Sequence, residues 1–225
     1  MLVRSGRLDY VLTARKEVVL SAGAFQSPQL LMVSGVGPAA TLQEHNITVL
    51  ADRPGVGQNM WDHIDIEVTY KVDVVGFNTL KNQTYNQEQL DGFHTIPAKS
   101  MYGSYGADYI GWEKLPADYR ANMSSNARDQ LATFPSDWPE VEYEVASIYK
   151  STDPEDFHGY GTFVVIPVSP LSRGSVSLLS NSMLDPPIID PRWLTNQADV
   201  ELAIQATKRA RQILASPALA PIRLG

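Results

Sequence analysis

The sequence predicts a mixed fold, part α/β and part α+β, and three observations carry that prediction. Before residue 63, short apolar runs are followed by helix signals, which is a strand–helix pattern. From Ile64 onward, apolar and polar residues alternate, as is typical of half-exposed antiparallel strands. The amphipathic segment 199–215 predicts a long helix over one face of that sheet. We place the domain boundary near His63, which gives domains 1–63 and 64–225.

The segment 16–37 organises the first domain. Val18–Leu20 is a short apolar run that predicts a buried strand. It is followed by small residues, including Ala22, Gly23 and Ala24, and such residues let a backbone approach a flat ligand closely. Ser27-Pro28 predicts the start of a helix, because serine can cap a helix and proline suits its first position. Gly35 predicts the left-handed cap at its end.

The remaining elements are predicted from periodicity and from breaker residues. We expect a hairpin arm over 6–13, a short helix over 38–46 with Leu42 inward, and a brief strand over 47–50. Weaker patterns suggest helices over 86–93 and 117–131.

The second domain is predicted to contain one antiparallel sheet. We expect its strands at 64–72, 141–149, 162–168 and 174–180, with the 199–215 helix packed on one face. Pro167 interrupts the third of these strands, which indicates a sheet edge or a bulge because proline cannot donate a ladder hydrogen bond.

Three motifs of the chain resemble signatures of the glucose–methanol–choline (GMC) oxidoreductase family. The first resembles the second family signature and comprises Gly23-Ala24, Ser27-Pro28, Leu30-Leu31 and Ser34-Gly35-Val36-Gly37. The second is similar to the segment that trails this signature and comprises Pro54-Gly55-Val56-Gly57, Asn59-Met60 and Asp62-His63. The third resembles the C-terminal region of the family and comprises Pro170-Leu171-Ser172-Arg173-Gly174-Ser175 and Pro187-Ile188-Ile189-Asp190-Pro191.

The resemblance implies FAD as cofactor and the oxidation of an alcohol CH–OH group. It implies that 1–63 is a remnant of an FAD-binding, Rossmann-like domain and that 64–225 is part of a substrate-binding domain. The cofactor-binding residues it implies here are Ala22, Gly23, Ala24 and Asn59. Family members also carry a GxGxxG turn for the FAD pyrophosphate and a catalytic histidine, and the sequence contains neither in the family's context. We therefore assign no catalytic residue, since His45, His63, His94 and His158 all lie outside that context.

The amino-acid composition argues against several classes of binding partner. The formal net charge of −7 disfavours non-specific binding to nucleic acid or to an anionic membrane. The absence of cysteine removes disulfides and thiolate metal sites, and no histidine pair has metal-ligand spacing, so no metal is expected. No apolar run is long enough to span a bilayer or to form a signal peptide, which taken literally keeps the chain in the cytoplasm. The resemblance implies a small alcohol as substrate.

Three hypotheses for the function remain open. The chain is an incomplete part of a working oxidoreductase, a natural short form that acts as a non-catalytic binding module, or a flavin-free isomerase or cyclase built on a substrate domain. We favour the first, in which the isolated chain is inactive and exposes apolar surface that promotes self-association.

Several side chains have two interpretations each. Tyr102, Tyr105, Tyr109 and Trp112 could line a substrate entrance, but scattered aromatics more often anchor loops to a core. Asp62 could act as a base, although capping of backbone N–H groups is the favoured role. Arg173 could bind an anion, although stabilising its own turn is the favoured role.

Overall fold

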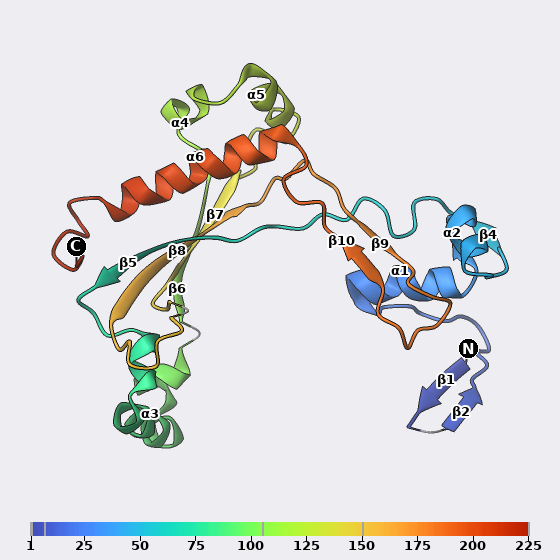
Figure 1. Ribbon diagram of the computed structural model, residues 1–225, viewed down its shortest axis with the longest axis horizontal. Coiled ribbons are helices and arrows are strands. Elements are labelled where there is room, and N and C mark those ends of the chain that lie inside the picture. The colour runs from blue at the N-terminus through green and yellow to red at the C-terminus, as the bar shows by residue number, and fades with distance from the viewer. Residues whose placement is uncertain (1, 7, 105, 150, 225) are drawn as a thin grey trace. The chain divides into compact units, whose positions relative to one another are not determined.

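The computed structural model describes residues 2–6, 8–104, 106–149 and 151–224. The chain divides into two compact units, which are described separately. Unit 1 combines Met1–Met60 with Gly174–Asp190, and unit 2 combines Trp61–Arg173 with Pro191–Gly225. The segment 174–190 therefore belongs with the first part of the chain, whereas the sequence interpretation had assigned it to the second. Figure 1 shows the elements of both units.

Unit 1 is built from small sheets and two helices. A hairpin, a parallel pair and an antiparallel pair make up its strands: β1 (Leu2–Ser5) with β2 (Leu8–Val11), β3 (Val36–Gly37) with β4 (Ala51–Asp52), and β9 (Ser175–Ser177) with β10 (Ile188–Asp190). Its helices are α1 (Gly23–Val33) and α2 (Ala39–Glu44). The predicted hairpin arm and the predicted helix with Leu42 inward are both confirmed, since β2 pairs with β1 and Leu42 is fully buried.

Helix α1 starts earlier than predicted. It begins at Gly23, so Ser27 and Pro28 lie inside it. The Ser27 hydroxyl oxygen accepts the N–H of Ala22, the residue that precedes the helix, at 3.0 Å. Ser27 therefore does accept a backbone N–H at the start of the helix, as predicted. It does so from a position inside the helix and not from the residue that precedes it. The end of the helix is as predicted, because Gly35 takes a left-handed φ of +88° just beyond it.

Two predicted strands of unit 1 are wrong. Val18–Leu20 forms no strand, and the exposed fraction of Val19 is 78%. A buried strand needs a hydrogen-bonded neighbour, and none of the described residues pairs with this run. The strand expected at 47–50 instead comprises Ala51–Asp52 and pairs with Val36–Gly37. The core of unit 1 consists of Met32, Leu42 and Leu178 with a few half-buried neighbours.

Unit 2 is organised by a four-stranded antiparallel sheet in the order β5–β8–β7–β6. Its strands are β5 (Ile66–Val72), β6 (Ala107–Glu113), β7 (Val141–Ala146) and β8 (Gly159–Pro167). Its helices are α3 (Gln83–Thr95), α4 (Ala117–Ala121), α5 (Ser125–Leu131) and α6 (Gln197–Leu214), with short 3₁₀ turns η1 (Phe77–Lys81), η2 (Pro97–Lys99) and η3 (Met101–Gly103).

Three of the four predicted sheet strands share this sheet. The fourth position is taken by β6, which the sequence did not predict, and not by 174–180, whose strand β9 pairs with β10 in unit 1. Pro167 does not mark a sheet edge, because β8 is an inner strand. It is the last residue of β8, where a missing N–H interrupts no further ladder bond.

Helix α6 supplies the core of unit 2. Asn196 caps its start by accepting the N–H of Ala198 at 2.9 Å. Leu202 and Ala206 are fully buried and pack with Val141 and Val165 of the sheet. The predicted helix and its packing on one face of the sheet are confirmed, and Figure 1 shows α6 lying along that sheet.

Candidate functional site

The predicted cofactor-binding residues all lie in unit 1. Ala22 precedes α1, and Gly23 and Ala24 are its first two residues. Gly23 has a φ of +81°, and a Cβ added there would meet nothing within 4 Å, so its backbone faces open space. Asn59 lies in the turn after β4 with a left-handed φ of +61°. Its exposed amide has no hydrogen-bond partner among the described residues, so it is available to a ligand.

Gly57 brings two of the motifs together in unit 1. Its φ is +77°, and a Cβ on it would lie 2.1 Å from the Val176 carbonyl oxygen, so only glycine fits. The Val176 N–H donates to the Gly57 carbonyl at 2.7 Å. Met60 and Gly174 exchange two further backbone hydrogen bonds, at 2.9 and 2.8 Å. Motifs that are more than a hundred residues apart thus form one paired element.

Helix α1 and the turn that carries Asn59 are linked through packing. Met32, the buried side chain of α1, lies beside Gly57. No hydrogen bond among the described residues joins Asn59 to Ala22–Ala24. The structure therefore places the four predicted residues in one unit, and their role in cofactor binding stays a prediction.

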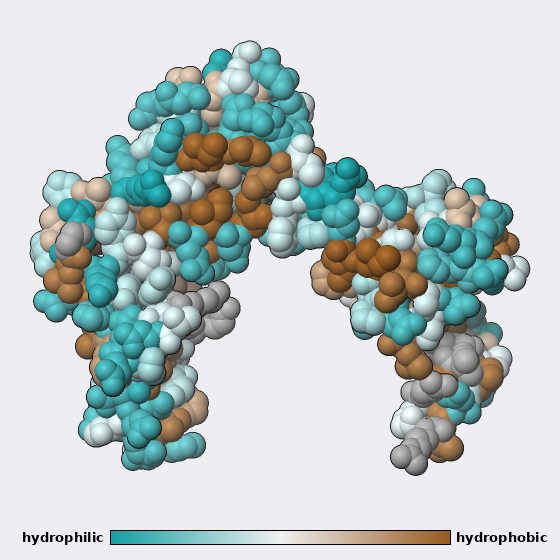
Figure 2. Space-filling view, in the orientation of Figure 1, coloured by the Kyte–Doolittle hydropathy of each residue, from teal (hydrophilic) through white to brown (hydrophobic). Residues whose placement is uncertain are grey.

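A cavity of about 800 Å³ lies in unit 1 beside α1. Apolar residues before the helix and on it form much of the lining: Val18, Val19, Leu20, Leu30, Leu31 and Val33. Asn181–Leu184 lies on the cavity as well. Figure 2 shows hydrophobic surface over α1 and β10 of this unit. The run that was predicted as a buried strand is thus an exposed apolar wall.

The motif residues in unit 2 have structural partners. The Arg173 guanidinium carbon lies 4.1 Å from the ring centroid of Trp61, and Arg173 Nη1 donates to the carbonyls of Pro170 and Ser172 at 2.6 and 2.9 Å. The turn-stabilising role favoured for Arg173 is therefore confirmed. Asp62 accepts the Trp193 indole N–H at 3.0 Å, which is a side-chain contact and not the backbone cap that was expected.

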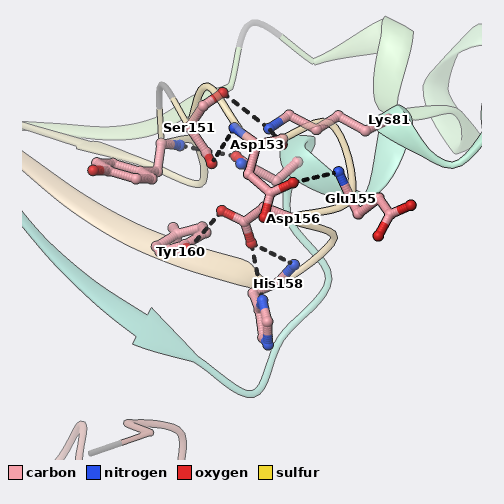
Figure 3. Close-up of polar contacts among 9 residues, drawn as sticks. Lys81, Ser151, Asp153, Glu155, Asp156, His158 and Tyr160 are labelled. Atoms are coloured by element: carbon pink, nitrogen blue, oxygen red, sulfur yellow. Dashed lines mark hydrogen bonds and ion pairs between the residues drawn. The ribbon is translucent and has the colours of Figure 1, made fainter.

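A polar cluster in unit 2 was missed by the sequence analysis. Asp156 accepts the Tyr160 hydroxyl at 2.8 Å, and His158 Nδ1 lies 2.9 Å from the same carboxylate (Figure 3). The hydrogen bonds from His158 and Tyr160 hold the pKa of Asp156 well below its usual range. Burial and the bond to Asp156 raise the pKa of Tyr160 to about 12. The spacing of these residues, i, i+2 and i+4, is the signal that could have found the cluster.

The contacts of this cluster hold a loop in place. Lys81 donates to the carbonyls of Ser151 and Asp153 at 3.0 and 2.7 Å, which ties the same loop to η1. Figure 3 shows these contacts around Asp156. In the described part of the chain, no group of histidine and carboxylate side chains has the arrangement of a metal site. Among the helices that the structure describes, none is both long and apolar enough to cross a bilayer.

The predicted entrance aromatics are scattered. Tyr109 and Trp112 lie on β6, with Tyr109 75% exposed, and Trp112 donates its indole N–H to Glu142 at 2.8 Å. Tyr102 donates its hydroxyl to Asn86 at 2.7 Å, which supports the anchoring role for this residue. Tyr105 lies outside the described residues.

Comparison with known proteins gives matches at both ends of the chain. Residues 3–65 match one family model described as GMC oxidoreductase, and residues 170–224 match a second with the same description. Patulin synthase of Aspergillus clavatus is 47% identical over 224 residues, which cover 96% of this chain and 36% of that protein. The chain thus spans about a third of the length of this relative.

Solved structures share the fold. Formate oxidase of Aspergillus oryzae matches with a TM-score of 0.88 at 22% identity, covering 99% of this chain and 41% of that one. An FAD-dependent oxidoreductase from Chaetomium thermophilum matches with a TM-score of 0.77 at 25% identity, covering 97% and 41%. With both family models matched and the motif pairs joined in one fold, the chain belongs to the GMC oxidoreductase family.

Proposed function

We propose that this chain supplies the cofactor-side turn and part of the substrate domain of an FAD-dependent enzyme that oxidises the CH–OH group of a small alcohol. The observation that carries the proposal is the pairing of the family motifs in unit 1 through Gly57–Val176 and Met60–Gly174. Both family matches are described as oxidoreductase, which favours redox chemistry over a flavin-free isomerase or cyclase and over a non-catalytic binding module.

The residues present fit a neutral part of FAD. The open backbone at Gly23 permits close approach, and the unpartnered amide of Asn59 offers both a donor and an acceptor. Ala22 is less suited, because its N–H already donates to Ser27. FAD, when bound, would accept the hydride from the alcohol carbon. We propose that Gly23, Ala24 and Asn59 hold its adenosine side, with Ala22 shaping the backbone beside them.

The experiment is a titration of the purified chain with FAD, followed by flavin fluorescence. We expect a dissociation constant no tighter than high micromolar, roughly 5–6 kcal/mol, because no residue assigned here holds the pyrophosphate. Asn59→Ala should weaken binding several-fold. Asn46→Ala is the matched control, since Asn46 is also a left-handed asparagine of unit 1, with φ +57°.

Two results would contradict this proposal. Equal FAD affinity of the wild type and Asn59→Ala would remove Asn59 from the site. Stoichiometric flavin on the purified chain would show that the chain holds the whole cofactor by itself. With FAD added, the chain should also show no alcohol-dependent reduction of an artificial acceptor, since we assign no residue to accept the alcohol proton.

We also propose that the chain self-associates through unit 1. The apolar wall of Val18, Val19 and Leu184 is exposed, and contiguous apolar patches promote association. Sedimentation velocity should show oligomers that Val19→Ser reduces, and a monodisperse monomer at all concentrations would contradict this.

A further inference from the structure

A cavity of about 220 Å³ lies in unit 2, next to the C-terminal end of α6. Strand residues Tyr70 and Phe163, which pack against the core on the α6 side of the sheet, form part of its lining. Leu214 at the end of α6 and the following Leu219 and Ile222 form another part. The cavity shares no residue with the predicted cofactor-binding set.

The lining is apolar apart from a few polar groups. Tyr160 contributes its ring only, because its hydroxyl donates to Asp156, as Figure 3 shows. Among the residues of the lining that the structure describes, Arg223 is the one that carries a charge. Its Nη1 donates to the Leu214 carbonyl at 3.0 Å, and no carboxylate of the described residues forms an ion pair with it. Several of its five N–H donors therefore remain available.

The backbone around Arg223 is fixed. Leu224 donates its N–H to the Lys71 carbonyl at 2.9 Å, and Asp73 donates to the Ile222 carbonyl at 2.7 Å. These bonds attach the segment to the end of β5, so Arg223 lies beside Val72 in a bridge. A guanidinium held at an apolar cavity is preorganised for a planar anion.

Size limits the ligand. A cavity of about 150 Å³ accommodates benzene, so 220 Å³ accommodates one ring and a short substituent. We propose that this cavity binds a small aromatic carboxylate, with its ring between Tyr70, Phe163 and Leu219 and its carboxylate on Arg223. The proposal does not depend on FAD or on the proposed oxidation.

The experiment uses the whole chain and 4-methylbenzoate as the probe, with 4-methylbenzamide as a neutral ligand of the same shape. Calorimetry and ¹⁵N amide shifts report binding. We expect saturable binding of the carboxylate that shifts the amides of Gly161 and Ile222, two residues of the lining. Arg223→Gln should weaken carboxylate binding about 10- to 100-fold, the range for a hydrogen bond to a charged group, and leave amide binding unchanged.

Two further variants keep the test decisive. Arg211→Gln removes the same charge from an exposed position on α6, and it should leave affinity unchanged. Tyr109→Ala removes an exposed part of the lining without touching the core, so it tests the site even where Arg223→Gln fails to fold, and it should weaken both ligands. The proposal is overturned by non-saturable binding, by shifts confined to amides elsewhere, or by equal losses in the two arginine variants.

Discussion

The two units differ in how their residues are used. Among the described residues, the core of unit 2 contains thirteen buried side chains in one cluster, whereas that of unit 1 contains three. Yet the first two GMC motifs lie mostly in unit 1, where the third is joined to them through Gly174 and Val176. Unit 2 is held together mainly by buried apolar side chains. In unit 1 the family motifs are held by turns and backbone hydrogen bonds. The residues that identify the family are therefore concentrated where the chain itself is least stabilised by packing.

The largest effect is expected from the core of unit 2. Leu202→Ala should cost about 2–5 kcal/mol of unfolding free energy, because Leu202 is fully buried between α6 and the sheet. Urea unfolding followed by tryptophan fluorescence measures this, since all four tryptophans lie in unit 2. Ile204→Ala, at a 46% exposed position of the same helix, should change the free energy by less than about 0.5 kcal/mol. Equal costs for the two variants would contradict the assignment of the core.

A smaller and separate effect is expected in unit 1. Gly57→Ala should cost roughly 1–3 kcal/mol, because alanine meets the Val176 carbonyl oxygen and must adopt a φ of +77°. The Val176 amide should exchange its hydrogen faster, while the tryptophan-monitored midpoint of unit 2 stays in place. Gly55→Ala is the control, since a Cβ there meets nothing within 4 Å. If Gly57→Ala lowered the stability of both units together, the chain would unfold as one unit and the contrast between the two units would be wrong.

The smallest effect is a pH dependence confined to unit 2. The folded pKa of Asp156 is lowered, so its ionised form adds stability above about pH 4, and this is lost as the pH falls toward the folded value. The folded pKa of Tyr160 is raised to about 12, so its neutral form adds stability below about pH 10 that is lost by pH 12.

Asp156→Asn should therefore destabilise unit 2 at pH 7 and converge with the wild type in acid. The unfolding midpoint measured from pH 2.5 to 7 checks this. Asp129→Asn, at an exposed carboxylate of α5, should show no such convergence. A constant difference between Asp156→Asn and the wild type over the whole range would contradict the lowered pKa.

Local sequence patterns predicted most helices and strands correctly, but they predicted poorly which strands pair with one another. The periodicity of α6 and the alternation in β5 and β7 correctly predicted a helix and strands, because each depends on neighbouring residues in sequence. Strand pairing is non-local, so nothing in 174–180 could show that it pairs with β10 and not with β8. Strand β6 was missed because its alternation is weak and includes Gly111. Val18–Leu20 was predicted from hydrophobicity alone, which cannot supply a neighbouring strand.

The candidate site could be predicted in part. Gly57 and Asn59 were singled out through the family resemblance, and both take a left-handed φ, which glycine and asparagine adopt more readily than other residues. The role of Asn59 in cofactor binding stays a prediction. The cavity at Arg223 could not be predicted, since its lining comes from four strands, the end of α6 and the following segment. The Asp156 cluster could have been predicted from the sequence, because its three residues occupy alternate positions in one short stretch of the chain.

Unit 1 is built from two separate segments of the chain, so it cannot be completed during synthesis until the second segment has been made. The ribosome must add residues 61–173 before β9 exists to meet Gly57, which at about 5–20 residues per second takes on the order of 10 s. Throughout that interval Gly57 and Met60 lack their hydrogen-bond partners Val176 and Gly174. Because β10 ends at Asp190 and α6 starts only at Gln197, the nascent chain can close unit 1 before the sheet of unit 2 receives its helix. The less densely packed unit is thus the first to have all of its helices and strands, although the four strands of unit 2 are synthesised before β9 and β10.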